Sequence, residues 1–533
     1  MEALAADNFG WLSILPPLIA ILLALITKEV ISSLLIGIFA GALIYSNFNP
    51  IEMVTTTFQI MGEKMGSNAN ILIFLGLLGA IVVIVTMAGG SSAYGKWATS
   101  KIKTRRGAAL ATSGLGCLIF IDDYFNCLTV GTVMRPVTDK YSISRAKLAY
   151  LLDATAAPIC IIAPISSWGA SVASYMQDSG VENGMAAFIQ TIPYNLYAIC
   201  TLAMIVIICI AKVNFGPMAK FEKNAIEKGD LHSSAQAVES EDFGGAKVKE
   251  NGNVIDLVLP ILSLILLTVL AMLYTGGLFD GTGMSFTAAI GNTDASLSLV
   301  LGGLATLIVT LLFYLPRKVM SFKTFMGGIT SGVKSMVPAY IILILAWTIG
   351  GISHMDYLNT GGFVGHLVND NNFPVFILPA ILFVVAGFLG FATGTSWGTM
   401  ALLIPIGAAI CITPDTQPLL IPIFGAILGG AVYGDHISPI SDTTILSSTG
   451  AGCAHIDHVS SQLPYATLVA VCCLVGYIIM GFTSNFFIPL AVTLALTISG
   501  TLVIGNISSK KNPIDYSNAD VDVELKINKS TTV

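Results

Sequence analysis

Residues 434–443 read GDHISPISDT, a polar run with two carboxylates and a proline inside otherwise apolar sequence. A run of similar character, FIDDYFN, occupies residues 120–126 in the other half of the chain. Carboxylates and helix breaks are costly in a lipid bilayer, and they persist where they line a site for an ion or a polar solute. The two runs therefore predict an all-α membrane protein whose helices break around a polar site at mid-membrane depth.

The composition of the chain supports this class. Of the 533 residues, 54% are hydrophobic and 11% are charged, whereas soluble domains carry roughly 25% charged residues. We therefore predict a polytopic protein embedded in the lipid bilayer. No basic patch interleaved with aromatic residues is present, which argues against a nucleic-acid partner. The nine cysteines form no CxxC motif and are odd in number, so we predict neither a disulfide framework nor a metal site from them.

Eleven apolar runs near 20 residues in length are candidate membrane spans. They cover residues 11–27, 30–46, 70–89, 146–176, 186–211, 254–275, 296–316, 336–352, 418–451, 464–484 and 486–506. Two more apolar segments, 107–134 and 373–412, each break at a polar tip, which predicts two hairpins. The first lies between clusters of Lys and Arg and has short arms, so we expect it to re-enter the membrane from the cytoplasmic side. The second starts and ends outside, and its longer arms leave two full spans as an alternative.

The Lys and Arg residues predict the orientation, because they collect in cytoplasmic loops. With the N-terminus outside, all but Lys64 of the 25 Lys and Arg residues fall on the cytoplasmic side. Residues 335–509 contain neither type, so the last third is anchored only at its ends. We expect a multi-pass protein of the cell (plasma) membrane with an external N-terminus and a cytoplasmic C-terminus. Residues 1–10 carry no Lys or Arg, so we expect the first apolar run to be retained as a span.

Both halves have the same order of elements: three spans, a polar-tipped hairpin, a long broken helix and a further span. The first half starts outside and the second inside, which predicts an inverted repeat of the kind found in secondary transporters. A helix of about 30 residues reaches about 45 Å against a hydrocarbon core of roughly 30 Å, so the long runs leave room for an unwound middle. The predicted units are two transmembrane repeats at 1–213 and 254–484, a cytoplasmic linker at 214–253, an extra C-terminal span at 485–506 and a cytoplasmic tail at 507–533.

Asp122 and Asp123 occupy the tip of the first hairpin, which should reach mid-membrane. Two adjacent carboxylates in a low dielectric resist double ionisation, and either a bound Na⁺ or a proton relieves their repulsion. Competition between these two cations is the simplest chemistry for exchange. Asn126 and Thr129 follow with oxygen ligands suited to a hard cation. The alternative is that the tip lies in the cytoplasmic interface, where both acids are merely solvated.

A second group of candidates lies in the broken helix at 146–176. Its members are Asp153, Thr155, Ser166 and Ser167. Pro158 and Pro164 remove backbone donors and leave free carbonyls between them. These carbonyls and the serine hydroxyls would complete a cation shell. A proline kink used for packing, with Asp153 near the cytoplasmic surface, is the alternative.

The second half supplies its own hairpin tip and the densest polar cluster within a span. The candidates are Gly394, Thr395 and Ser396 at the tip and Asp435, Ser438, Ser441, Asp442 and Thr443 in the broken helix. Helix ends that meet at a turn offer free amides to an anion or free carbonyls to a cation. No Lys or Arg lies near these acids in the sequence, so they should hold a cation or a proton, unless His436 satisfies them within a structural network. Residues 455–458 fall in a predicted cytoplasmic turn, where we interpret both histidines as ordinary residues rather than metal ligands.

At these residues the chain resembles the NhaC family of sodium/proton antiporters. The resemblance is carried by FIDDY at 120–124, DATAAPI at 153–159, PISSWG at 164–169, ATGTSWG at 392–398 and GDHISPISD at 434–442, and it extends over about residues 10–500. It implies the ion-transporter fold, in which each inverted repeat has a hairpin and a discontinuous helix. It also implies that the transport region contains Asp122, Asp123, Asn126, Asp153, Thr395, Ser396, Asp435, Ser438 and Asp442. Members of the family differ in cargo: some resemble plain Na⁺/H⁺ exchangers, and others exchange malate and lactate or carry amino acids.

The sequence thus predicts a Na⁺/H⁺ antiporter that works by alternating access, with Na⁺ held by Asp122, Asp123, Asn126, Asp435 and Asp442. An ion-coupled transporter of small carboxylates or amino acids is the alternative, with the cargo carboxylate at the hairpin tips. We do not predict an enzyme, because the sequence around Asp435 does not match an intramembrane aspartyl protease. No cofactor is expected beyond Na⁺ and H⁺ themselves. The expected partners are the bilayer, these two ions, an organic anion or amino acid in the alternative case, and a second copy in a homodimer.

Overall fold

The computed structural model describes residues 9–27, 30–164, 166–232, 252–281, 283–286, 289, 293–354, 356–360, 362–363, 374–411, 414 and 416–516. Residues 1–8, residues 233–251 of the predicted linker and residues 517–533 of the predicted tail lie outside this part, as do stretches of the predicted external loops. Within the described residues the regular structure is entirely helical, as predicted.

The helices follow one another in two series. The first contains α1 (Leu15–Thr27), α2 (Val30–Tyr45), α3 (Pro50–Ser67), α4 (Ala69–Met87), α5 (Gly90–Lys101), α6 (Arg105–Leu118), α7 (Asp123–Lys140), α8 (Arg145–Cys160), α9 (Ser167–Asp178), α10 (Gly184–Thr191), α11 (Leu196–Ala211) and α12 (Pro217–Lys228). The second contains α13 (Ile255–Thr275), α15 (Ala295–Tyr314), α16 (Phe322–Ser335), α17 (Val337–Ser353), α19 (Leu378–Thr393), α20 (Ser396–Ile410), α21 (Leu420–Ile437), α22 (Asp442–Ala451), α23 (His455–Thr483) and α24 (Phe487–Lys511).

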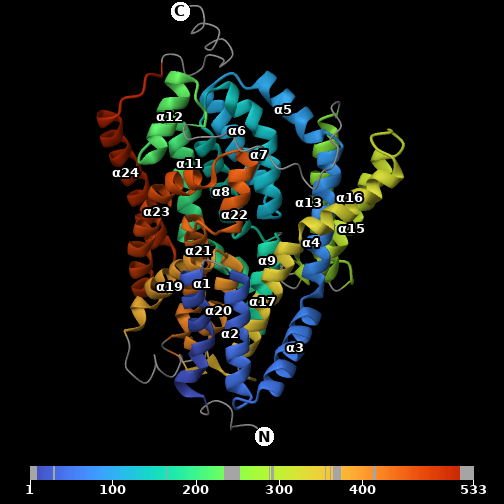
Figure 1. Ribbon diagram of the computed structural model, residues 1–533, viewed down its shortest axis with the longest axis vertical. Helices are drawn as coiled ribbons and strands as arrows, with labels where there is room; N and C mark the ends of the chain where they lie inside the picture. The colour runs from blue at the N-terminus through green and yellow to red at the C-terminus, as the bar shows by residue number, and fades with distance from the viewer. Residues whose placement is uncertain are drawn as a thin grey trace, which may run out of the picture.

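Half-length helices meet at the middle of the molecule. Figure 1 shows the hairpin α6–α7 in the upper half together with α8 and α22, whereas the hairpin α19–α20 lies in the lower half together with α9 and α21. The two hairpins therefore approach the centre from opposite ends. The two broken helices, α8–α9 and α21–α22, cross that centre in opposite directions. This is the arrangement that the inverted repeat predicts.

The two helix breaks have clear local causes. In the first, Pro164 has no backbone N–H to donate, and Ser166 restarts the chain as the N-cap of α9 by accepting a hydrogen bond from the amide of Gly169 at 2.9 Å. In the second, the extended residue Ser438 ends α21. Ser441 then caps α22 by accepting from the amide of Thr444 at 3.1 Å. The predicted interruptions in 146–176 and 418–451 are confirmed.

Two arginines of the first series fix the far end of α22. Arg135 donates to the carbonyl of Gly450 at 2.6 Å, and Arg145 donates to the carbonyl of Ala451 at 2.6 Å. The last carbonyls of a helix lack partners within the helix and carry partial negative charge, so cations are favourable there. Residues 335–509 hold no Lys or Arg of their own, so the first series supplies the cations for this helix end of the second.

Fewer helices qualify as single spans than the eleven predicted. In the described part, seven helices are long and apolar enough to cross a membrane, or nine if each of two bent pairs counts as one span. The difference has a physical reason: α1 and α17 have fewer than 18 residues, and the break divides the predicted span 146–176 into two short helices. An apolar run in sequence does not reveal whether one helix or two half-helices cross the bilayer.

Two amphipathic helices were not predicted. The helix α3 leaves α2 at an angle of 118°, and its start could have been read from Asn49, whose side chain caps the helix next to Pro50. The helix α12 lies within the predicted linker 214–253 and buries Met218, Phe221 and Glu222. The beginning of that segment is therefore packed structure, and α24 likewise continues to Lys511, inside the predicted tail.

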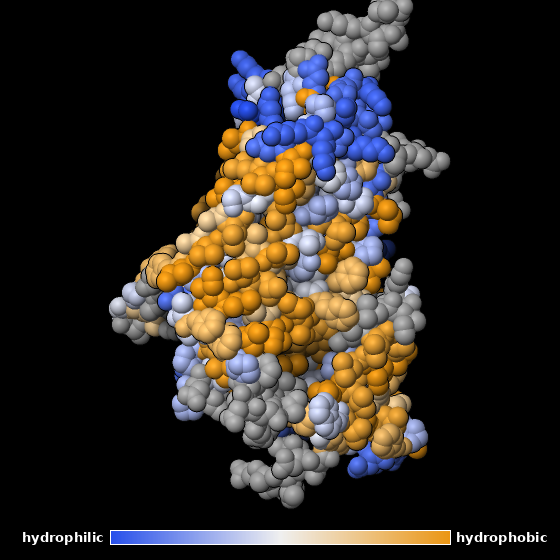
Figure 2. Space-filling model, turned by 90° about the vertical axis from the view of Figure 1, so that its left-hand side faces the viewer, coloured by the Kyte–Doolittle hydropathy of each residue, from blue (hydrophilic) through white to orange (hydrophobic). Residues whose placement is uncertain are grey.

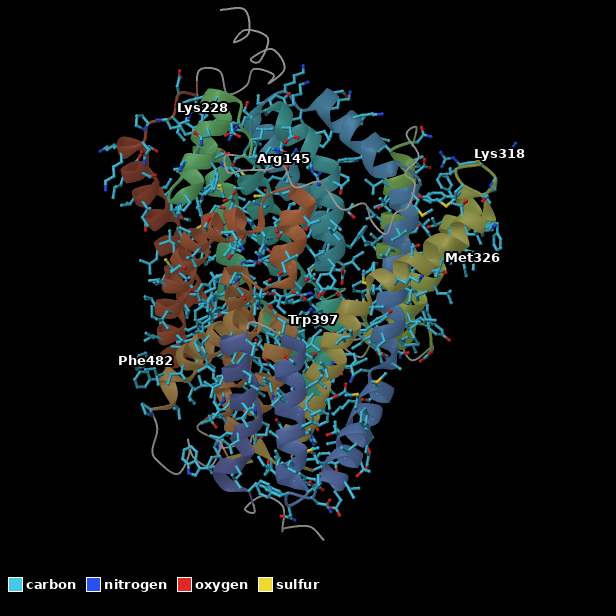
Figure 3. The ribbon with its side chains drawn as sticks, viewed as in Figure 1. Arg145, Lys228, Lys318, Met326, Trp397 and Phe482 are labelled. Carbon is cyan, nitrogen blue, oxygen red and sulfur yellow. The ribbon has the colours of Figure 1, made fainter. Side chains whose placement is uncertain are left out.

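The surface is that of a membrane protein. Figure 2 shows a broad apolar band over the middle of the molecule and hydrophilic residues gathered at its upper end. Large apolar side chains such as Leu312 and Phe482 are 67% and 66% exposed, as expected for residues that face lipid. Arg145, Lys228 and Lys318 all lie in the upper half, far from Phe482 (Figure 3). The chain is a multi-pass membrane protein with its cations concentrated towards one end.

Candidate functional site

Four helices begin at the centre of the molecule, namely α7, α9, α20 and α22 (Figure 1). Their first turns present backbone N–H groups without helical partners, and each N-terminus carries a partial positive charge. The indole rings of Trp168, in α9, and Trp397, in α20, lie 5.1 Å apart between centroids. Trp397 is labelled near mid-height in Figure 3. These four first turns therefore offer N–H donors to buried carboxylates at the centre.

The tip of the first hairpin buries both predicted acids. Asp122 and Asp123 are each 1% exposed, which excludes the alternative of a solvated interface. Asp122 caps α7 by accepting from the amide of Phe125 at 3.1 Å, and it also accepts from the hydroxyl of Ser167 at 2.9 Å. Asp123 accepts from the indole N–H of Trp168 at 2.9 Å. The hairpin tip is thus tied to the first turn of α9 by two neutral donors.

The second half places two more carboxylates at the same centre. Asp435, near the end of α21, accepts from the hydroxyl of Ser396 at 2.8 Å and from that of Thr443 at 3.4 Å. Asp442 opens α22, where it accepts from the amide of Thr443 at 2.8 Å and from the phenol of Tyr124. Tyr124 belongs to the first hairpin, so this hydrogen bond joins the two halves. Asp123 is close enough to Asp442 and Asp435 for their charges to interact.

Gly394 fits the second hairpin against the break in α21–α22. Its φ of +66° is in the left-handed region, which a side chain disfavours. A Cβ at this position would meet the carbonyl oxygen of Ile440 at 2.6 Å. Gly394, predicted as a site residue, therefore has a structural role, since it lets the hairpin tip approach the extended backbone at residues 438–441.

Gly394→Ala should lower the stability of the protein. The left-handed conformation costs a non-glycine residue about 1–2 kcal/mol, and the contact with Ile440 adds to this. We expect a lower unfolding temperature for the purified variant. Gly327→Ala is the matched control, because Gly327 has nothing within 4 Å of the added carbon and lies in a helix. Equal unfolding temperatures for Gly394→Ala and the wild type would contradict this assignment.

Several other predicted site residues form hydrogen bonds or packing contacts within the fold, and their role as ion ligands stays a prediction. Ser166 accepts from the amide of Gly169, Ser438 donates to the carbonyl of Phe391 at 2.8 Å, and Ser441 caps α22. Thr155 donates to the carbonyl of Leu151 one turn earlier in α8 at 2.7 Å. Thr129 is buried within α7. A hydroxyl that donates to a carbonyl, as those of Ser438 and Thr155 do, keeps its oxygen lone pairs as acceptors.

Four buried oxygen atoms at or beside this centre accept no hydrogen bond within the described part of the chain. They are Asp123 Oδ2, Asn126 Oδ1, Thr395 Oγ1 and Asp435 Oδ1. The amide nitrogen of Asn126 is fixed by the carbonyls of Gly116 at 2.6 Å and Ile119 at 2.8 Å, which orients its oxygen. Carboxylate, amide and hydroxyl oxygens are the ligands that hard cations prefer. The donor set fits a cation such as Na⁺.

No Lys or Arg compensates this group of acids. In the described residues, no Lys or Arg forms an ion pair with Asp122, Asp123, Asp435 or Asp442. The same residues contain no group of three or more His, Cys, Asp or Glu side chains arranged to hold a metal ion. A Na⁺ ion there would need hydroxyl, amide or carbonyl oxygens as well, and the predicted ligand set of Asp122, Asp123, Asn126, Asp435 and Asp442 stays a prediction.

Asp153 forms a separate polar centre beside the first. It is fully buried, so it is not a solvated surface carboxylate. One carboxylate oxygen accepts from Gln462 at 2.6 Å and from Thr444 at 3.1 Å, and it lies 3.2 Å from Nε2 of His458. Thr444 follows Thr443, which contacts Asp435. Adjacent residues in the first turn of α22 therefore link the two centres.

His458 and Gln462 were missed in the sequence. The prediction placed residues 455–458 in a cytoplasmic turn, and for His458 this is wrong, because α23 begins at His455 and His458 is fully buried. The predicted span 464–484 had started too late. Polar residues four positions apart lie on one face of a helix, and this spacing was the available signal. Gln462 also donates to the carbonyl of His436 at 2.6 Å, which fixes the end of α21.

Several known proteins are similar to this chain in sequence. The chain is 41% identical over 511 residues to an uncharacterized protein of Haemophilus influenzae, covering 92% of this chain and 95% of that protein. It is 30% identical to the malate-2H⁺/Na⁺-lactate antiporter of Bacillus subtilis, over 30% of this chain and 34% of that one. It is 28% identical to an uncharacterized Na⁺/H⁺ antiporter of H. influenzae, over 30% of this chain and 33% of that one.

The family match covers more of the chain than the two antiporter relatives do. Residues 159–482 match the profile of the Na⁺/H⁺ antiporter family, and this range includes the second hairpin, both segments of α21–α22 and most of α23. The members with a stated activity among these relatives are transporters and not enzymes. The resemblance seen in the sequence is thereby confirmed, and the chain belongs to the Na⁺/H⁺ antiporter family of secondary transporters.

Proposed function

We propose that this protein exchanges Na⁺ for H⁺ at the centre formed by the two hairpin tips and the break in α21–α22. One observation carries the proposal: four buried carboxylates lie near one another, and their hydrogen-bond donors in the described residues are hydroxyl, indole and amide groups. Buried acids without a compensating cation must bind a proton or a metal cation. Either occupant removes the same repulsion, so each excludes the other.

The exchange cycle follows from this exclusion. Na⁺ would enter from one side and be held by Asp435, Asp442 and Asp123. Oxygen atoms that have no hydrogen-bond partner in the described residues, such as Oγ1 of Thr395, would complete its coordination. Protonation of the same acids from the opposite side would release it. The transition between the two states would be a movement of one repeat against the other about this centre. We further propose that residues 1–213 and 254–484 are these repeats, separated by the segment 214–253, with α24 (Phe487–Lys511) as an extra span and a tail after it.

The proposed orientation has the N-terminus outside and the C-terminus in the cytoplasm of a cell bounded by the plasma membrane. The distribution of Lys and Arg along the chain supports it, and so does the position of Arg145, Lys228 and Lys318 towards one end (Figure 3). Na⁺ and H⁺ are cargo in this mechanism, and we propose no resident cofactor. The predicted homodimer is retained as a proposal.

An organic anion is not the favoured cargo. The B. subtilis relative exchanges malate and lactate, but it matches only 30% of this chain. In the described residues no Arg or Lys pairs with an acid at the centre, and none is present in residues 335–509 to hold a substrate carboxylate. The helix N-termini alone would have to hold the anion beside four acids, and the negative charges of these acids would repel it.

The test is proton movement in proteoliposomes that hold a pH gradient and contain no organic solute. Addition of NaCl should collapse the gradient much faster than it does in vesicles without protein. Choline chloride at equal ionic strength should not collapse it. Protein that is folded, correctly inserted and unresponsive to Na⁺ would refute the proposal. In that case the same vesicles would be screened with carboxylates and amino acids.

A further inference from the structure

A cavity of about 300 Å³ lies at the cytoplasmic end of the first series of helices, away from the ion centre. Its polar lining is dominated by four cations: Arg105, Arg106, Lys147 and Lys212. None of the residues that line it is Asp or Glu. Apolar side chains from α6 and α11, including Ala109 and Ile208, form the rest of the wall. A cavity of this volume and charge suits a small anionic group.

One carboxylate balances two of these cations. Glu222 of α12 is fully buried; it pairs with Arg105, and its carboxylate lies 3.3 Å from the ammonium of Lys147. Lys147 also donates to the side chain of Asn214 at 3.0 Å. The lining itself holds no acid, so its net charge is positive. Arg106 and Lys212, which line the cavity without forming an ion pair in the described residues, increase it further.

The segment after α24 completes the cavity. Tyr516 accepts a hydrogen bond from the side-chain amide of Asn214 at 3.0 Å and donates one to the carbonyl of Lys212 at 3.2 Å. The ammonium of Lys212 lies 4.8 Å from the centre of its ring. The C-terminal segment is thus held across the end of α11, and the ammonium of Lys212 lies against the ring of Tyr516.

The position of the cavity relates it to the membrane surface. The helix α6 begins at Arg105, so its N-terminal amides add partial positive charge at the cavity. Leu110 of α6 and Val206 and Ile210 of α11 are 38%, 48% and 49% exposed, as residues in contact with lipid would be. The cavity therefore lies where these helices leave the bilayer, beside the head groups of the cytoplasmic leaflet.

We propose that this cavity binds a phosphate group, carried either by an anionic phospholipid of the cytoplasmic leaflet or by a soluble phosphate-bearing anion. Clusters of Arg and Lys between helices at the cytoplasmic side recognise such groups, because guanidinium and ammonium groups donate charge-assisted hydrogen bonds to phosphate oxygens. The bound phosphate would neutralise the excess charge of the cavity. It would also join α6, α11 and the C-terminal segment.

The purified full chain should be titrated with phosphatidylglycerol, with phosphatidylcholine and with inorganic phosphate while its unfolding temperature and bound lipid are measured. The wild type should bind phosphatidylglycerol and be stabilised by it, and phosphatidylcholine should have little effect. The double variant Arg106→Gln, Lys212→Gln should bind roughly tenfold more weakly or worse, because it loses two of the four cations. It leaves the buried pairs of Glu222 intact, so its fold should be retained.

The control removes the same charge from the same end of the protein. Lys220 and Lys228 lie on α12 but do not line the cavity, so the double variant Lys220→Gln, Lys228→Gln should bind as the wild type does. Binding of phosphatidylglycerol alone identifies a lipid site, and competition by inorganic phosphate identifies a soluble anion. No binding of either probe, or an equal loss in the control variant, would overturn the proposal. None of these readouts depends on transport.

Discussion

Asp435→Asn should abolish Na⁺-driven proton movement while the protein still inserts and purifies. The amide keeps the shape of the side chain and its contact with Ser396, but it carries no charge for Na⁺ to neutralise and takes up no proton near neutral pH. We expect the initial rate in the proteoliposome assay to fall by about 100-fold or more, since the variant removes the cargo-binding charge rather than a spectator contact.

Stability separates this loss from misfolding. Removing an uncompensated buried charge should leave the unfolding temperature unchanged or raise it. The control is Asp280→Asn, the same substitution at an exposed position in a turn, which should transport as the wild type does. Transport by Asp435→Asn at more than a tenth of the wild-type rate would show that this carboxylate is not an obligatory ion ligand.

Glu222→Gln should be strongly destabilising for a conservative substitution. The variant removes the carboxylate that pairs with both Arg105 and Lys147, which are themselves buried. Removing one partner of a buried ion pair costs about 3–5 kcal/mol. Thermal unfolding of the purified protein measures the effect. Glu227→Gln, which removes an exposed partner of Lys223 at 4.0 Å, should cost about 0.5 kcal/mol or less.

The same residue predicts how stability depends on pH. Burial alone would raise the pKa of Glu222, but Arg105 and Lys147 outweigh it and hold the pKa at about 2. An unperturbed glutamate titrates near pH 4.3, so the folded protein binds this proton less readily than the unfolded chain. The stabilisation is present above about pH 4.3 and is lost as the pH falls through about 2. Between these limits the wild type should lose stability faster than Glu222→Gln; parallel curves would contradict this.

Several features of the fold could be predicted because they follow from local chemistry. Pro164 and Ser438-Pro439 stand among polar residues in otherwise apolar runs, so the breaks in 146–176 and 418–451 were readable from the sequence. The hairpins were readable because polar tips interrupt apolar runs. The number of single spans was not, since hydropathy does not distinguish one long helix from two half-helices that meet end to end.

The partners of the acids could not be predicted. Tyr124 and Asp442 lie 318 positions apart in the sequence. No local sequence pattern indicates that the hairpin of one half contacts the start of a helix in the other half. His458 was assigned to a turn because the apolar run of α23 becomes clear only after Pro464, although the helix itself begins at His455. The candidate acids could be predicted because a carboxylate costs free energy in a bilayer. Their hydrogen-bond donors could not, because these depend on how the two halves pack.

The first turn of α22 places Thr443 against Asp435 and the adjacent Thr444 against Asp153. The side chains of consecutive helix residues point about 100° apart, so they reach different partners from one turn. A rotation of this turn would change the Thr443–Asp435 and Thr444–Asp153 hydrogen bonds together. In the proposed mechanism, cation occupancy at Asp435 and protonation of Asp153 should therefore be coupled. By thermodynamic reciprocity, whatever factor a cation at Asp435 applies to proton affinity at Asp153, a proton at Asp153 applies to cation affinity at Asp435.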